Sequence, residues 1–175
     1  MTRIITHSFF FRIALLVITS IILTSCGVYS FTGASIPPEA KTVSVQYFPN
    51  RALLVEPILS PVFTNILRDK FTGQTNLEMI ERNGDLSIEG EIVGYDIKPV
   101  AIQADQTAAQ NRLSITVNVR FSNKYEPDKD FERKFTQFFD YASNTTDFDS
   151  IKTAIMDELS EALAQDIFDE AVINW

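Results

Sequence analysis

The chain of 175 residues carries 15 basic and 23 acidic side chains, a formal net charge of −8 at pH 7. This length favours a single domain. The acidic balance excludes nucleic acid as the main partner, because phosphate binding needs a strongly basic face. With 45% hydrophobic and 22% charged residues, the chain has enough apolar surface to form a folded core. The single histidine, His7, and the single cysteine, Cys26, both lie near the N-terminus.

The first 25 residues have the pattern of an export signal. Arg3 and Arg12 precede an uncharged run of 11 residues, 13–23. A positive start followed by about 7–15 apolar residues is typical of a signal peptide, and the run is short for a membrane-spanning helix, which needs about 20. We therefore expect residues 1–25 to be removed from the mature protein.

Cys26 follows Leu23-Thr24-Ser25 and precedes Gly27, which resembles the bacterial lipobox. In a lipobox the cysteine thiol is the lipid acceptor, so Cys26 is the expected lipid attachment site; the alternative is a free cysteine. With no second cysteine, an intramolecular disulfide is impossible. Acyl chains, at about 0.8 kcal/mol per buried CH₂, would hold the protein on a membrane. The glycine after the cysteine, in place of aspartate, favours the outer membrane.

Removal of the signal changes the chemistry that remains available. Residues 26–175 carry 13 basic and 23 acidic side chains, a net charge of −10, and no histidine. This excludes Ser-His-Asp and Cys-His nucleophilic sites and the usual zinc and copper ligands. Glycine-rich phosphate-binding motifs are also absent from the sequence. Carboxylate-only hydrolysis stays open, but no pair of acids stands out. The sequence predicts a protein that is not an enzyme and needs no cofactor or metal.

The segment after Cys26 predicts a tether followed by one domain. Residues 26–41 have no periodicity and contain Pro37-Pro38, so we expect a lipidated tether there and a single domain over 42–175. Alternating apolar residues predict a strand over 42–48. Apolar residues at helical spacing then predict an amphipathic helix ending near residue 73. Its start is open: the helix begins at Pro57, or Ser60 is its N-cap.

The middle of the chain reads as a series of strands. A short strand over 77–82 is followed by Asn83-Gly84 and a strand that begins at residue 86, a pattern that predicts a β-hairpin. The apolar face of that second strand changes near Gly94, which indicates a bulge. A polar, Ala/Gln-rich stretch predicts a loop over 99–110.

The clearest element is a strand over 112–123, where five apolar residues alternate with five polar ones. This pattern predicts one buried and one wet face. A last strand over 131–141 and a helix over about 150–171, capped by Asp149 or Ser150, complete the chain. The order β-α-β-β-β-β-α predicts an α+β two-layer sandwich, with two helices packed on one face of a mostly antiparallel sheet of four or five strands.

This element order, after a lipobox cysteine followed by Gly-Val-Tyr-Ser-Phe-Thr-Gly, resembles the LptE-related family of lipopolysaccharide-assembly lipoproteins. Residues 111–115, 121–123 and 166–175 strengthen the resemblance. It implies an outer-membrane lipoprotein, facing the periplasm or a barrel lumen, that assembles with and plugs an LptD-type β-barrel. Together the two proteins would deliver lipopolysaccharide to the outer leaflet. The alternative is a generic envelope lipoprotein, either a ligand-binding module or a pilotin for another outer-membrane pore.

The resemblance directs attention to the strand over 112–123 and the residues after it. Lumen-facing residues of outer-membrane barrels are polar, so the polar side of this strand is the candidate barrel-facing surface; the alternative is an ordinary solvated sheet face. The candidate residues are Ser114, Thr116 and Asn118. Residues 112–134 have a net charge of +2 and residues 147–170 have −7. Because lipopolysaccharide is anionic, Arg112, Arg120 and Lys124 are its candidate contacts, with plain solubility charges as the alternative.

Overall fold

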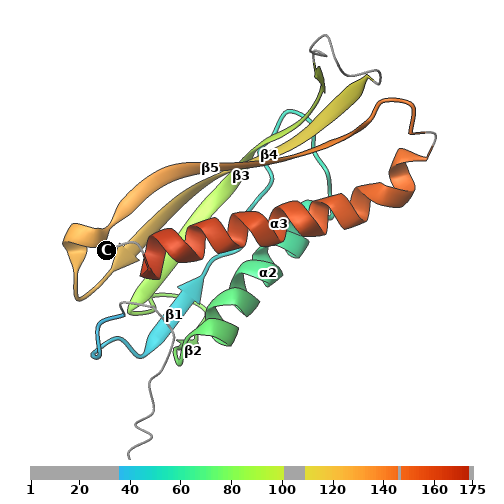
Figure 1. Cartoon of the computed structure of the whole chain (residues 1–175). Coiled ribbons are helices and arrows are strands. Elements are labelled where there is room, and N and C mark those ends of the chain that lie inside the picture. Colours follow the sequence, from blue (N-terminus) through green and yellow to red (C-terminus); the bar gives the residue numbers. More distant parts are fainter. Residues whose placement is uncertain (1–35, 101–108, 146, 174–175) are drawn as a thin grey trace, which may run out of the picture. The chain divides into compact units, whose positions relative to one another are not determined.

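The computed structural model describes residues 36–100, 109–145 and 147–173. In chain order (Figure 1) the elements are β1 (Thr42–Val45), α2 (Leu59–Gln74), β2 (Glu78–Met79), β3 (Leu86–Val100), β4 (Gln110–Asn123), the 3₁₀ turn η1 (Pro127–Lys129), β5 (Phe131–Ala142) and α3 (Phe148–Val172). The predicted order β-α-β-β-β-β-α is confirmed. Cys26 and the expected signal lie outside the described residues.

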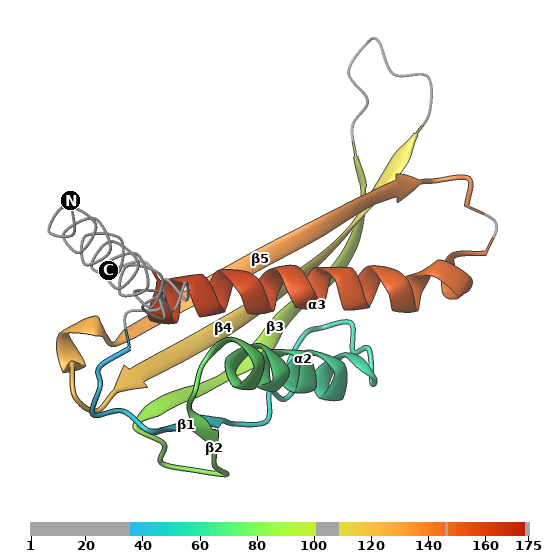
Figure 2. The same ribbon diagram turned by 60° about the horizontal axis from the view of Figure 1, so that its bottom comes forward.

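The strands form one five-stranded sheet in the order β2-β1-β3-β4-β5. The pairs β3–β4 and β4–β5 are antiparallel, whereas β1 is parallel to both of its neighbours. Both helices lie on the same face of the sheet (Figure 2), with α3 running along β4 and β5 and α2 beside it. The fold is therefore the predicted α+β two-layer sandwich with a mostly antiparallel sheet.

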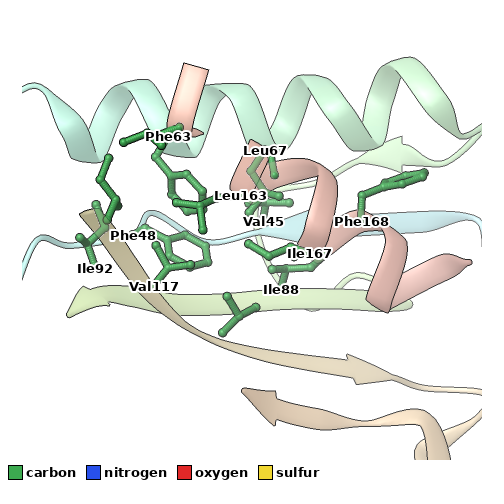
Figure 3. Close-up of a cluster of buried hydrophobic side chains, with 14 of the residues drawn as sticks. Val45, Phe48, Phe63, Leu67, Ile88, Ile92, Val117, Leu163, Ile167 and Phe168 are labelled. Atoms are coloured by element: carbon green, nitrogen blue, oxygen red, sulfur yellow. The ribbon is translucent and has the colours of Figure 1, made fainter. Parts of the chain in front are cut away.

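The core fills the space between the helices and the sheet. The five apolar residues of β4 predicted to face inward are at most 1% exposed: Leu113, Ile115, Val117, Val119 and Phe121. From the helix layer, Phe63 of α2 and Leu163 of α3 are fully buried against them (Figure 3). Burying one such side chain contributes about 1.5–3 kcal/mol, so this face of the sheet is the main source of stability.

The hairpin predicted at Asn83-Gly84 is wrong. Strands β2 and β3 do not pair with each other, because β1 lies between them: Val43 pairs with Met79 on one side and with Leu86 on the other. The turn itself forms, with Asn83 at a φ of 56°. The chain there crosses the end of β1, where the Gly84 N–H donates to the Ser44 hydroxyl at 3.1 Å. The Asn-Gly turn favours pairing of β2 with β3. Instead β1, which lies some 40 residues earlier in the chain, pairs with β3.

Several boundaries also differ from the expectation. Strand β1 ends at Val45, and β2 has only two residues. The loop predicted over 99–110 is shorter, because Pro99 still pairs with Asn111. The bulge near Gly94 is confirmed by a register shift between Ile92 and Gly94. Ala40, two residues before the expected start of the domain, is buried in the core.

The helix starts were predicted incorrectly. The N-cap of α2 is Ile58, which makes no side-chain capping bond, so the helix neither begins at Pro57 nor uses Ser60 as its cap. The cap of α3 is Asp147, whose carboxylate accepts a hydrogen bond from the Ser150 N–H at 3.2 Å. Which residue caps a helix depends on the direction from which the chain enters it. Neighbouring residues alone do not determine that direction.

Candidate functional site

The sheet face turned away from the helices carries polar residues in rows across three strands. We call this surface the open face. Its members are Ser87, Glu89, Glu91, Asp96 and Lys98 on β3; Arg112, Ser114, Thr116, Asn118, Arg120 and Ser122 on β4; and Glu132, Lys134, Thr136, Phe138 and Asp140 on β5. Among the described elements, both helices pack on the opposite face. The open face is thus a regular polar surface available to a partner.

The three candidate barrel-facing residues lie next to one another in the centre of the open face. The Thr116 and Thr136 hydroxyls are 2.9 Å apart and hydrogen-bonded. The Asn118 amide donates to Glu132 at 3.2 Å. Ser114 lies between Asp96 of β3 and Phe138 of β5. All three candidates are half-buried between neighbouring side chains, so together they form a polar surface, and Asn118 at its edge also lines a hollow.

Arg112 is held on two sides. Its guanidinium donates to both Asp140 oxygens, at 2.7 and 2.8 Å, and lies 3.8 Å from the centre of the Phe138 ring. The Arg112 hydrogen bonds hold the pKa of Asp140 below its ordinary value. A bidentate pair combined with a cation–π contact fixes the orientation of the guanidinium. Arg112 is therefore a rigid, charge-compensated group at one end of the open face.

Arg120 lies beside a shallow acidic hollow of about 370 Å³. Its guanidinium contacts Glu132 at 3.3 Å, with both side chains more than half exposed. The pKa of Glu132 is lowered mainly by the hydrogen bond from Asn118 and, to a smaller extent, by the one from Arg120. The hollow is lined by Gln46, Tyr47, Glu89, Gly90, Glu91, Asn118, Arg120 and Glu132. Three carboxylates around one guanidinium give this part of the open face a net negative charge, so an anion can bind Arg120 only by displacing Glu132 from it.

Lys124 follows β4 and contacts Asp85 at 3.4 Å. The same carboxylate accepts hydrogen bonds from the Lys41 N–H at 3.0 Å and from the Thr42 N–H and hydroxyl at 3.1 and 3.0 Å. The Lys41 N–H is the main cause that lowers the pKa of Asp85 to about 2. Lys124 is therefore an exposed cation beside the turn between β2 and β3, which Asp85 ties to the start of β1.

The three candidate cations do not form one basic patch. Arg112 and Arg120 are eight residues apart on one strand, about 26 Å at 3.3 Å per residue, and each of the three contacts a carboxylate. The open face as defined carries five carboxylates and four bases. The positive balance of residues 112–134 therefore disappears once β3 brings Glu89, Glu91 and Asp96 beside β4.

The sequence did not indicate the hollow beside Arg120. Tyr47 comes from the segment after β1 and Glu89 and Glu91 come from β3, so their meeting depends on the pairing of β1 with β3. Gly90 alone carried a local signal: a side chain there would lie 2.6 Å from Cε1 of Phe48. A glycine within a strand indicates such a close approach but not which residue makes it.

The described residues hold no metal-binding cluster: no three or more histidine, cysteine, aspartate or glutamate side chains are arranged around a common point. Within those same residues, no helix is both long enough and apolar enough to cross a membrane. What the structure offers instead is a polar sheet face suited to contact with another molecule.

Comparison with known structures gives weak similarities. A minor lipoprotein from Acinetobacter baumannii is 13% identical, with a TM-score of 0.47 over 72% of this chain and 91% of that one. The rare lipoprotein B from Shewanella oneidensis is 10% identical, with a TM-score of 0.42 over 73% and 93%. Lipoprotein B from Nitrosomonas europaea is 10% identical, with a TM-score of 0.47 over 83% and 88%. No curated protein matches the chain. None of these comparisons bears on function.

Fold and surface together define a two-layer α+β domain with one apolar, helix-covered sheet face and one polar, open one. The family whose description is LptE, lipopolysaccharide-assembly, matches residues 40–171. The chain belongs to this family, as the sequence motifs indicated. The match covers β1 to nearly the end of α3, and so includes every strand of the sheet and both helices.

Proposed function

We propose that this protein is a lipid-anchored, non-enzymatic outer-membrane subunit that sits in the lumen of an LptD-type β-barrel and assists lipopolysaccharide transport into the outer leaflet. In this proposal residues 1–25 are the signal peptide, Cys26 is acylated, residues 26–41 tether the chain, and residues 42–175 form the domain. Membership of the lipopolysaccharide-assembly family supports a role in lipopolysaccharide transport.

The open face is the observation that supports insertion in a barrel. The interior of an outer-membrane barrel is polar, and the open face presents hydroxyl, amide and charged groups in rows across three strands. Apart from Phe138, which is 51% exposed, its members can exchange water for polar partners. Ser114, Thr116 and Asn118 lie in its centre and are the proposed barrel contacts.

Lipopolysaccharide is the proposed ligand of the exposed cations. Arg120 and Lys124 are 61% and 67% exposed and contact their carboxylates at 3.3 and 3.4 Å. Exposed ion pairs of this kind contribute at most about 1 kcal/mol, so a phosphate group can compete for these cations. Arg112 keeps further N–H donors beyond those bound to Asp140 and is the third proposed contact.

Recovery of the complex from outer membranes tests the proposal. A C-terminally tagged chain extracted in mild detergent is expected to retain the barrel of the lipopolysaccharide exporter in a stoichiometric complex. Cys26→Ala should appear in the soluble periplasmic fraction. Recovery with a different outer-membrane pore would support the pilotin alternative, and recovery without any barrel would contradict the proposal.

The open face itself is tested by a matched pair of variants. Thr116→Arg places a long charged side chain in its centre, and Thr153→Arg makes the same change at an exposed position of α3. We expect Thr116→Arg to reduce retention of the barrel and Thr153→Arg to leave it unchanged. Circular dichroism of both variants checks the fold. Equal retention by the two variants would exclude the open face as the contact surface.

A further inference from the structure

The loop between β1 and α2 exposes four large aliphatic side chains, which the open face does not include. Leu53 is 107% exposed, and Leu54, Val55 and Ile58 are 42–58% exposed. We call these four residues the aliphatic loop. Contiguous exposed apolar residues in a folded protein mark an interaction site. In Figure 2 this loop lies at the same end of the molecule as the start of α3.

The aliphatic loop is held in place at its base. The Asn50 side chain accepts a hydrogen bond from the Ala52 N–H at 3.0 Å and donates one to the Glu56 carbonyl at 3.2 Å. The Arg51 N–H donates to the Ile92 carbonyl at 2.8 Å, which attaches the loop to β3. The apolar side chains therefore project into solvent from an ordered backbone. An ordered loop loses little conformational entropy when it binds.

A salt bridge fixes the other side of the loop. Lys152 of α3 contacts the Glu56 carboxylate at 3.1 Å, and both side chains are at most a quarter exposed. Lys152 also contacts Asp149 at 3.5 Å. Leu53, Leu54 and Val55 thus extend between two anchored points, Asn50 and Glu56, which keeps them away from the core that the other aliphatic residues fill.

The charges around the loop decide between a lipid surface and a protein surface. Segments that bind anionic bilayers carry several lysine or arginine residues beside the apolar ones. Here Arg51 and Lys152 are outnumbered by Glu56, Asp147 and Asp149, and Asp149 is exposed. The excess of acidic groups around the loop favours a partner with basic groups. An apolar pocket with basic groups at its rim has this chemistry, and such a pocket is a feature of a protein partner.

We infer that the aliphatic loop docks into an apolar pocket on the partner protein, separately from the polar contact of the open face. This inference rests on the proposed function, in which the partner is the exporter barrel. The open face then supplies polar contacts and the loop supplies the apolar anchor. In a protein–protein interface the apolar core is fully buried, whereas the polar rim stays accessible to solvent.

The test compares variants of the full chain in the barrel pull-down. Leu53→Ser combined with Leu54→Ser removes the anchor, and Tyr125→Ser, just after β4, removes a ring that is 42% exposed. We expect at least a tenfold loss of barrel affinity for the double variant and none for the control. Both should keep the wild-type thermal midpoint, because the replaced side chains lie outside the core. Wild-type affinity of the double variant would overturn the inference.

A photocrosslinking amino acid placed at position 54, with position 125 as control, identifies the occupant. A crosslink from position 54 to the barrel supports the inference. A crosslink to lipid or to a second copy of the chain overturns it, while the proposed function stands if the wild type still retains the barrel. Failure of the wild type to retain any barrel overturns the proposed function and this inference together. Asn50→Ala should weaken binding several-fold, because the loop loses its support.

Discussion

The two faces of the sheet are built from alternate residues of the same strands but have opposite properties. On β4, Ile115 is fully buried beneath the helices, whereas its neighbour Thr116 lies on the open face, where its hydroxyl is hydrogen-bonded to Thr136. The difference separates stability from recognition: inner residues determine whether the domain folds, and outer residues are available to a partner. Substitutions at adjacent positions should therefore have different consequences.

The largest expected effect is on the inner face. Ile115→Ala should lower the free energy of unfolding by about 2–5 kcal/mol, because it removes buried methylene groups and leaves a cavity. Thr116→Ala, the matched change one residue along, should alter it by no more than about 1 kcal/mol. Urea unfolding followed by circular dichroism measures both. Similar values for the two variants would show that the faces are not energetically distinct.

Gly90 tests how closely the chain packs behind the open face. A Cβ at position 90 would lie 2.6 Å from Cε1 of Phe48 and would also collide with the backbone of Asn118. Gly90→Ala should therefore destabilise the domain by about 1–3 kcal/mol. Gly73 in α2 is the control, since nothing lies within 4 Å of a Cβ built there.

For Gly73→Ala we expect a gain of about 0.5–1 kcal/mol, because alanine has the higher helix propensity. Thermal unfolding of both variants measures the contrast. A neutral Gly90→Ala variant would mean that β3 and Phe48 can move apart without loss, which would contradict close packing at this site.

A smaller, pH-dependent effect is expected at Asp85. Its pKa in the folded protein is about 2, below the ordinary value of 3.8, so the unfolded chain binds the proton more readily. The stabilisation is therefore complete above about pH 4 and is lost as the pH falls towards 2. Asp85→Asn should reduce stability at pH 7 by about 1–2 kcal/mol, because it replaces charged hydrogen bonds with neutral ones.

Unfolding of wild type and Asp85→Asn between pH 2 and 7 checks the sign of this effect. The stability difference between the two proteins should diminish as the solution is acidified. A difference that stays constant over the whole range would show that the carboxylate charge of Asp85 makes no contribution.

The smallest expected effect concerns lipopolysaccharide. Arg120→Glu and Lys124→Glu, tested singly, should each weaken binding of fluorescent lipopolysaccharide by about threefold to tenfold, and less at high salt. Arg82→Glu makes the same change in charge at an exposed position after β2. Equal weakening by all three variants would indicate a general charge effect and would remove Arg120 and Lys124 from the contact surface.

The local patterns predicted much of the fold. Neighbouring residues determine the spacing of side chains along a strand or a helix. This spacing predicted the alternation along β4, the two helices and the change of face near Gly94. The insertion of β1 between β2 and β3 could not be predicted in this way. The partners of Val43 are some 40 residues away, and the Asn83-Gly84 signal favours a hairpin that the sheet does not form.

The candidate site likewise has one part that the sequence predicted and one part that it did not. The sequence by itself determined that the polar residues of β4 share one face, because side chains in a strand alternate, and its motifs indicated the family. Tertiary structure decided which charges meet: Asp140 beside Arg112, Glu132 beside Arg120 and Asp85 beside Lys124. It also decided that the aliphatic loop stays exposed. Charge pairing and burial depend on which distant segments come together, and only the pairing of strands and packing of helices settles that.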